Sequence, residues 1–213
     1  MSRRGQKSIA LLVAAAIAFF VYLDRTGRIE GLGARTYSHA MDNNLPAQDD
    51  RAKYHLKTFI VTKVVDGDTL DINLPDGKYK TTRIRLLGVD TPETKKPNTP
   101  VMYFGPEAYA FTKHVALGKQ VIVIIDTVSR PRDRYGRLLG YVRLEDGNVL
   151  NQLLVEQGFA YADLRFKHTE FEKYKILMGQ AQQNKKGLWK NLKFEDMPPW
   201  LQKIKPTILK KAG

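Results

Sequence analysis

The sequence predicts an α+β fold in which five short strands close into a small barrel and three helices pack outside it. Three observations lead to this prediction: β-rich runs come first in the globular part, turn signals separate them, and runs with helical spacing follow. The chain of 213 residues suits one domain with a substantial core, once a short N-terminal segment is set aside.

The expected strands are short runs rich in β-branched and aromatic residues. They are Phe59–Val65, Thr69–Leu74, Thr81–Val89, Gln120–Asp126 and Leu138–Leu144. Pro75-Asp76-Gly77 is a strong turn signal between the second and third runs. The expected helices are Pro106–Leu117, Val149–Gln157 and His168–Lys186, each with apolar residues at helical spacing. Together these elements favour a five-stranded β-barrel of the oligonucleotide-binding type (OB-fold) with three packed helices.

An apolar run at the N-terminus predicts a hydrophobic helix before the barrel. Ile9–Leu23 spans 15 residues, between the core of a signal peptide and the roughly 20 residues of a transmembrane helix, and Arg3, Arg4 and Lys7 precede it. We favour an uncleaved membrane anchor in residues 1–24. The basic end should stay inside, which places the remainder of the chain on the extracytoplasmic side. A signal peptide cleaved after Ala18, giving a secreted protein, is the alternative.

The composition divides the rest of the chain into three parts. Residues 25–57 are polar without sustained periodicity and are interpreted as a linker. Residues 58–189 form the expected globular domain, and residues 190–213 form a basic tail in which Trp200 and Leu201 could provide some order.

Charge and cysteine content limit the classes of function. The formal net charge is +13 and is spread along the chain, which favours a polyanionic partner such as nucleic acid over solubility alone. The chain contains no cysteine, which excludes disulfides, thiolate metal sites and a cysteine nucleophile.

Two carboxylates in a basic domain suggest a bound cation. Asp68 lies at the start of an expected strand, and Asp90 closes the apolar run Ile84–Val89. Each could belong to an ordinary turn, because Asp-Gly is a common hairpin signal. Two facing carboxylates, however, repel each other unless a metal or a proton lies between them, and oxygen ligands suit Ca²⁺ or Mg²⁺.

Two arginines and one glutamate add the groups that phosphodiester hydrolysis needs. Arg85 lies inside an apolar strand, where a charge is costly unless it is paired or functional, although an outward-facing arginine would be ordinary. Arg137 follows a turn-like segment and could be a solvated loop residue. Both could bind phosphate oxygens in bidentate fashion, and Glu93 could activate water.

Four motifs in order resemble those of the thermonuclease family, the staphylococcal-nuclease-like (SNase-like) domains. They are Val-Val-Asp-Gly-Asp-Thr-Leu, Arg-Leu-Leu-Gly-Val-Asp-Thr-Pro-Glu-Thr, Tyr-Phe-Gly-Pro-Glu-Ala and Asp-Arg-Tyr-Gly-Arg. The resemblance covers about residues 58–189. It implies a calcium-dependent nuclease that hydrolyses DNA and RNA with little sequence specificity and leaves 3′-phosphate ends.

The resemblance also implies a role for each matching residue. Asp68 and Asp90 correspond to calcium ligands, with the backbone carbonyl of Thr91 as a third. The remaining assignments are a catalytic trio of Arg85, Glu93 and Arg137 and a terminal-phosphate pair of Arg134 and Tyr135.

The sequence departs from the family at the paired tyrosines of the base pocket, for which Tyr161 or Phe166 could substitute. The alternative function is a non-catalytic nucleic-acid-binding module, since degenerate copies of the domain serve that role. No protein partner is evident from the sequence.

Overall fold

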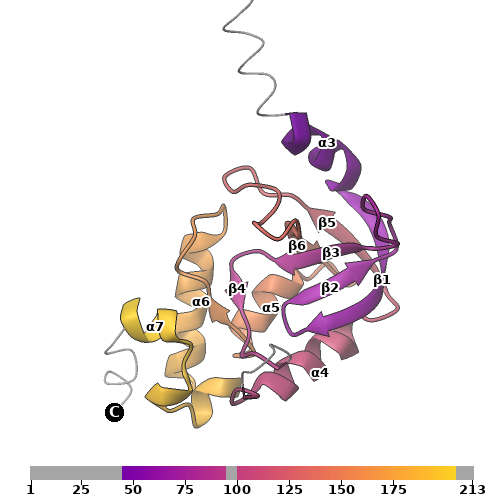
Figure 1. The fold of residues 1–213 in the computed structure, drawn as a ribbon. Helices are drawn as coiled ribbons and strands as arrows, with labels where there is room; N and C mark the ends of the chain where they lie inside the picture. The colour runs from indigo at the N-terminus through magenta and orange to yellow at the C-terminus, as the bar shows by residue number, and fades with distance from the viewer. Residues whose placement is uncertain (1–44, 95–99, 205–213) are drawn as a thin grey trace, which may run out of the picture. The chain divides into compact units, whose positions relative to one another are not determined.

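The computed structural model describes residues 45–94 and 100–204. The chain divides into two compact units, Met1–Asp49 and Asp50–Gly213. The second unit holds the barrel and every described residue of the candidate site, so the architecture below concerns that unit (Figure 1).

Five strands form a closed barrel in the order β1-β2-β3-β6-β5. Their bounds are β1 Lys57–Asp66, β2 Thr69–Ile72, β3 Thr82–Leu86, β5 Gln120–Ile124 and β6 Leu138–Arg143. The long strand β1 pairs with both β2 and β5, and two register shifts along its pairing with β2 bend it around the barrel. Only β3 and β6 are parallel among the barrel pairs. The prediction of a five-stranded barrel with packed helices is confirmed.

Alternation along the strands fills the barrel with aliphatic side chains. In β3, for example, Thr82, Ile84 and Leu86 are buried while Arg83 is exposed. Leu70, Ile72, Ile84 and Leu138 are completely excluded from solvent. This core fixes the strand ends that carry the candidate site.

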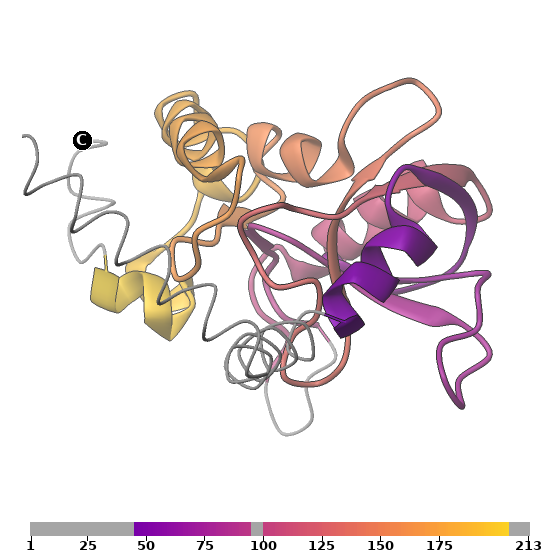
Figure 2. The same ribbon diagram turned by 90° about the horizontal axis from the view of Figure 1, so that it is seen from above.

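Three helices lie where the sequence predicted them. They are α4 (Gly105–Ala116), α5 (Leu150–Glu156) and α6 (Phe171–Gln183). Helix α4 packs against β1, whereas α5 packs against β6 and runs beside α6 (Figure 2). The apolar spacing that predicted α6 corresponds to its buried face of Tyr174, Met178 and Ala181.

The prediction of a single strand over Thr81–Val89 is wrong, because the chain turns at Gly88. Strand β3 ends at Leu86, and β4 (Val89–Asp90) pairs instead with β7 (Tyr161–Ala162) in a separate two-stranded sheet. Gly88 has φ of +76°, and a Cβ atom there would lie 2.4 Å from the His168 ring. The apolar composition concealed a turn that only glycine can make here.

Part of the segment interpreted as a linker is helical. Helix α3 (Leu45–Tyr54) precedes β1, and its last residue, Tyr54, is fully buried in the core. The Tyr54 hydroxyl lies 3.1 Å from Thr82 Oγ1. Residues 49–53 are polar apart from Ala52 and lack apolar periodicity, so the sequence pattern did not indicate this helix.

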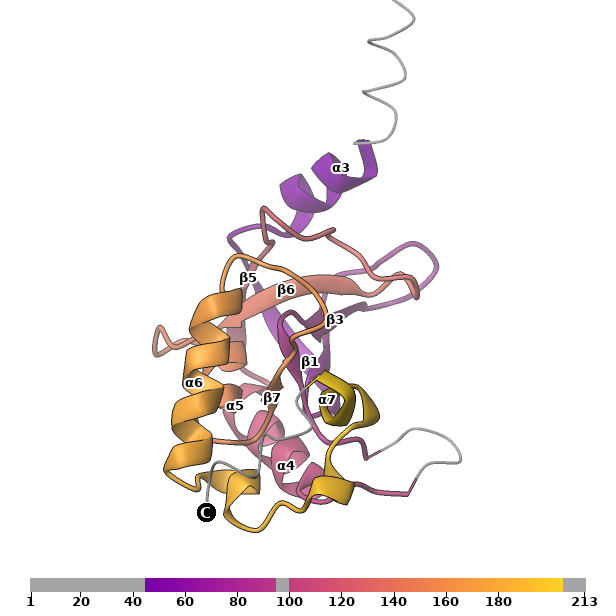
Figure 3. The same cartoon turned by 90° about the vertical axis from the view of Figure 1, so that its left-hand side faces the viewer.

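Residues 187–204 add three short helical elements after α6. After η1 (Gly187–Lys190) come the short turns η2 (Phe194–Asp196) and α7 (Pro199–Ile204). Met197 and Leu201 are buried in the core cluster, so this part of the predicted basic tail belongs to the folded unit (Figure 3).

No helix in residues 45–94 or 100–204 is long and apolar enough to cross a membrane. The predicted anchor Ile9–Leu23 lies outside the described residues.

Candidate active site

The turn between β1 and β2 places the first acidic residue of the site. Asp66 pairs with Thr69 across the hairpin, so Gly67 and Asp68 form a two-residue turn. A Cβ atom on Gly67 would lie 2.8 Å from Thr91 Oγ1, so this close approach requires glycine. The Thr112 hydroxyl on α4 donates to Gly67 O at 2.6 Å and supports the turn from the helix side.

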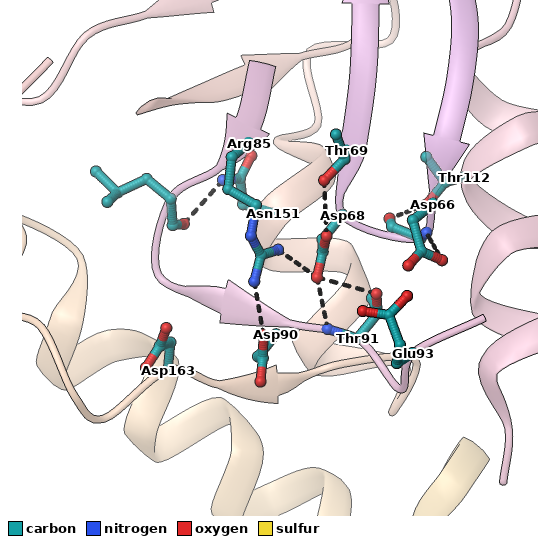
Figure 4. Close-up of polar contacts among 12 residues, drawn as sticks. Asp66, Asp68, Thr69, Arg85, Asp90, Thr91, Glu93, Thr112, Asn151 and Asp163 are labelled. Atoms are coloured by element: carbon teal, nitrogen blue, oxygen red, sulfur yellow. Dashed lines mark hydrogen bonds and ion pairs between the residues drawn. The ribbon is translucent and has the colours of Figure 1, made fainter. Parts of the chain in front are cut away.

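Asp68 is fixed by a set of donors. Its Oδ2 atom accepts hydrogen bonds from the Thr91 backbone N–H at 2.8 Å and the Thr91 hydroxyl at 3.0 Å. Its Oδ1 atom accepts from the Thr69 hydroxyl at 3.0 Å. Asp68 is only 6% exposed, so these bonds hold a largely buried carboxylate in one orientation (Figure 4).

Arg85 joins the two predicted metal ligands. Residue 85 lies opposite Thr69 in the β2–β3 pairing, which brings its side chain to Asp68. Its Nη1 atom forms an ion pair with Asp68 Oδ2, and its Nη2 atom donates to Asp90 Oδ1 at 2.6 Å. The expected cost of a charge inside an apolar strand is therefore offset by pairing. Burial lowers the pKa of Arg85, but the surrounding carboxylates outweigh it and raise that pKa overall.

Asp90 reaches this position because of the turn after β3. Asn151 on α5 is completely buried and holds that turn by donating to Leu87 O at 2.9 Å and Gly140 O at 3.1 Å. Asp90 Oδ2 accepts from the Trp200 indole Nε1 at 2.7 Å and lies 3.4 Å from Arg165 Nη2. The two oxygens of Asp90 therefore contact different groups, Oδ1 the Arg85 guanidinium and Oδ2 Trp200 and Arg165.

Glu93 lies on the same side of the site as Asp66 and Asp68 (Figure 4). Its Oε1 atom accepts from the Thr94 backbone N–H at 3.1 Å. Burial raises the pKa of Asp66 to about 6, and the neighbouring Asp68 and Glu93 carboxyl groups act in the same direction. The carboxyl groups on this side of the site therefore add to burial in disfavouring the ionised form of Asp66.

The donor set fits a hard divalent cation. Asp68 Oδ2 and Asp90 Oδ1 pair with the two terminal nitrogens of the Arg85 guanidinium, so the two carboxylates lie beside the same cationic group. All the candidate donors are oxygen atoms, which Ca²⁺ and Mg²⁺ prefer. Within the described ranges, no group of three or more His, Asp or Glu side chains is arranged to hold a metal ion. The third ligand that the resemblance implies, the backbone carbonyl of Thr91, is not a side-chain group of this kind.

Arg137 lies in a separate cluster on the loop between β5 and β6. Its Nε atom donates to Asp133 Oδ2 at 2.7 Å, and its backbone N–H donates to Asp133 Oδ1 at 3.0 Å. Its guanidinium carbon also lies 5.5 Å from the ring centre of Tyr135, which is 67% exposed. Arg134 covers the same ring at 4.7 Å. In the described part of the chain, the hydrogen bonds, ion pair and ring contact of Arg137 are all with residues of this loop.

A neighbouring arginine that the sequence analysis missed anchors this loop. Arg132 donates to both carboxylate oxygens of Asp50, at 2.7 and 2.6 Å, and to both oxygens of Asp76, at 2.6 and 3.1 Å. It also donates to Gly136 O at 2.8 Å. The loop that carries Arg137 is therefore tied to α3 and to the β2–β3 connection.

The sequence analysis did not assign several other residues of the site, and only some of them lie in a motif that could have identified them. Asp66 belongs to the same motif as Asp68 and could have been included. In the short stretch after β7, the Arg165 guanidinium donates two hydrogen bonds to the Asp163 carboxylate, both at 2.8 Å. Trp200 is 110 residues from Asp90, and no local pattern links them.

The two candidates for an aromatic base contact differ in exposure. Tyr161 is completely buried and meets Trp189 edge-on, with ring centres 5.6 Å apart, so it cannot line a base pocket. Phe166 is 63% exposed and remains available.

The fold and these residues agree with the comparisons to known proteins. The family described as Staphylococcal nuclease homologue matches residues 83–191. The chain therefore belongs to the staphylococcal nuclease homologue family.

Three relatives illustrate the similarity. The chain is 40% identical over 136 residues to a thermonuclease of Staphylococcus hyicus, covering 63% of this chain and 77% of the relative. It is 43% identical over 126 residues to a thermonuclease of Staphylococcus intermedius, covering 59% and 70%. It is 34% identical over 147 residues to an uncharacterized endonuclease of Escherichia coli, covering 66% and 81%.

Proposed function

We propose that the protein is a nuclease that hydrolyses phosphodiester bonds of DNA and RNA with little sequence specificity and depends on Ca²⁺. The observation that carries this proposal is the pairing of Asp68 and Asp90 with one buried guanidinium, that of Arg85, with Glu93 on the Asp68 side of the site. The relatives named as thermonucleases and an endonuclease support the same class of reaction.

Asp68, Asp90 and the Thr91 backbone carbonyl would hold the calcium ion. When bound, the ion would neutralise a phosphate oxygen and polarise the phosphorus. The hydrogen bonds from Thr69 and Thr91 keep the Asp68 carboxylate in place for this purpose. The buried position of Asp68 also limits competition from water.

Glu93 would accept a proton from the attacking water molecule. As the water oxygen bonds to phosphorus, the bond to the 5′ oxygen breaks, and that oxygen takes up a proton from solvent. The phosphate stays on the 3′ oxygen, which gives 5′-hydroxyl and 3′-phosphate ends. Proton acceptance of this kind contributes about 10²- to 10⁴-fold to a rate.

The two arginines would stabilise the charge that develops on the phosphate. Arg85 has five N–H donors, so it can contact Asp68 and Asp90 and still offer donors to a phosphate oxygen. Arg137 would approach the phosphate from the β5–β6 loop and act through electrostatic stabilisation, because its high pKa makes it a poor proton donor. Arg134 and Tyr135 on that loop would hold a terminal phosphate.

Digestion assays test this function. Purified protein should degrade plasmid DNA and RNA with Ca²⁺, less well with Mg²⁺, and not in excess chelator. The new 5′ ends should accept label from polynucleotide kinase without phosphatase treatment, because they carry hydroxyl groups. Binding of nucleic acid without cleavage under all these conditions would favour a non-catalytic module instead.

We further propose that Ile9–Leu23 anchors the protein in a membrane with the nuclease domain on the extracytoplasmic side. The basic residues before this run support the orientation, and export would keep a nonspecific nuclease away from the genome. Protease treatment of intact cells should degrade the domain while the full-length chain fractionates with membranes. A full-length chain that is soluble in the cytoplasm would contradict the proposal, whereas a soluble exported form starting near residue 19 would support cleavage.

A further inference from the structure

The C-terminal helix α7 contacts one of the proposed metal ligands directly. The indole Nε1 atom of Trp200 donates to Asp90 Oδ2 at 2.7 Å, across 110 residues of sequence. Trp200 lies beyond residues 83–191, the part of the chain that matches the family. This contact therefore comes from an element outside the matched region.

Trp200 is held in place from several sides. The next residue, Leu201, is completely buried, and Met197 before the helix is 1% exposed. The guanidinium carbon of Arg165 lies 4.6 Å from the centre of the Trp200 ring. Arg165 is itself fixed by its two hydrogen bonds to Asp163. The indole N–H is thus directed at Asp90 by packing and by a cation–π contact.

The contacts give the two oxygens of Asp90 different roles. Oδ1 of Asp90 pairs with Arg85, which also pairs with Asp68. Oδ2 faces Trp200 and Arg165 on the opposite side. Trp200 fixes the plane of the carboxylate without adding charge, because the indole is a neutral donor. Partners that orient a ligating carboxylate in this way typically change metal affinity 10- to 100-fold when removed.

We propose that Trp200 is a positioning residue for the metal site, so that α7 supports a centre whose proposed ligands all lie between residues 68 and 91. The proposal rests on the proposed function, in that Asp90 must bind the ion. A purely structural α7 would instead affect stability alone. The two possibilities differ in one measurable quantity, the affinity for Ca²⁺ in the absence of substrate.

The test is calcium titration of the full-length protein by calorimetry, comparing wild type with Trp200→Phe. Phenylalanine keeps an aromatic ring beside Arg165 but removes the N–H donor. We expect Ca²⁺ to bind the variant about 10- to 100-fold more weakly. Its Tm without calcium should stay near that of wild type, and the rise in Tm on adding calcium should be smaller. Lys203→Ala, on the exposed side of the same helix, should leave the affinity unchanged.

A second measurement uses the wild-type protein and does not depend on the folding of a variant. The chain has two tryptophans, Trp189 and Trp200, so the ¹H–¹⁵N spectrum contains two indole signals. Calcium should shift the Trp200 signal and slow its exchange with solvent, while the Trp189 signal stays in place.

The outcomes separate this proposal from the proposed function. Calcium binding by wild type together with equal affinity in folded Trp200→Phe would overturn the role of Trp200 and leave the nuclease function intact. If Trp200→Phe does not fold, an unresponsive Trp200 signal in calcium-binding wild type would overturn it as well. A wild-type protein that binds no calcium would overturn both proposals.

Discussion

At the scale of single residues, Arg85 is the centre of the candidate site. Its guanidinium is the positive group between Asp68 and Asp90, and its side chain is 14% exposed. A buried carboxylate pair without this charge would carry uncompensated repulsion. Arg85 therefore has a structural role as well as the proposed role in stabilising the phosphate.

Replacing Arg85 should expose both roles. In Arg85→Ala we expect the cleavage rate to fall about a hundredfold or more, through loss of a charge-stabilising donor. In chelator, the free energy of unfolding should fall by about 3–5 kcal/mol, because Asp68 and Asp90 lose the guanidinium that pairs with both of them. Calcium should recover part of that loss, which denaturant titration with and without the ion would measure.

Arg83 provides the matched control for this variant. It lies two residues away on β3, is exposed, and pairs with Asp71 at 2.8 Å, away from the site. Arg83→Ala should cleave DNA at the wild-type rate. A loss of activity equal to that of Arg85→Ala would contradict the assigned role of Arg85.

Glu93 can be tested separately, since the proposal assigns it to proton transfer. Glu93→Gln keeps the shape of the side chain but removes the base, so turnover should fall about a hundredfold or more while the fold is retained. Steady-state cleavage and circular dichroism would measure the two properties. Glu107→Gln on the exposed face of α4 is the control, and near wild-type turnover of folded Glu93→Gln would favour a different base.

At the scale of elements, a buried polar network joins β5, β6 and the start of α6. Asp126 Oδ1 accepts from the Tyr141 hydroxyl at 3.2 Å and the Thr169 N–H at 3.1 Å, and Oδ2 accepts from the Ser129 N–H at 2.7 Å. The Tyr141 hydroxyl also lies 2.9 Å from His168 Nδ1. Burial raises the pKa of Asp126, but the hydrogen bonds outweigh it and lower that pKa from 3.8 to about 2.

The lowered pKa makes a prediction about stability against pH. The ionised Asp126 contributes fully above its unfolded pKa of 3.8, and this contribution is lost as pH falls towards the folded value of about 2. Asp126→Asn should therefore be less stable than wild type by about 2 kcal/mol at pH 7. The difference should shrink between pH 4 and pH 2 in denaturant titrations. A difference that does not change with pH would contradict the assignment.

The elements also show how far sequence reasoning can reach. Asp68 and Asp90 could be predicted as neighbours because each lies at a strand end within a specific motif. The break at Gly88 could not, since the run from Ile84 to Val89 is apolar except for Arg85 and Gly88, and the close approach of the His168 ring is a tertiary contact. The bonds from Arg132 to Asp50 and from Trp200 to Asp90 join residues 82 and 110 apart, so tertiary packing alone creates them.

At the scale of the whole molecule, the formal charge of +13 should make binding to nucleic acid depend on salt. If Arg85, Arg134 and Arg137 contact phosphates, raising salt from 50 to 200 mM should weaken DNA binding roughly ten- to a hundredfold. Fluorescence anisotropy with a labelled oligonucleotide and the slowly cleaving variant Glu93→Gln would measure this binding. Arg134→Ala should reduce the salt dependence, and an unchanged slope would remove Arg134 from the phosphate contacts.

The most direct test of the whole account is the calcium dependence of DNA cleavage in wild type and Asp90→Asn. We predict that wild type is inactive in excess chelator and reaches a saturating rate as calcium rises. Asp90→Asn should need a higher calcium concentration, because it removes one of the two charged ligands. Full wild-type cleavage in chelator, or the same calcium dependence in Asp90→Asn, would contradict the central claim that Asp68 and Asp90 hold the ion used for hydrolysis.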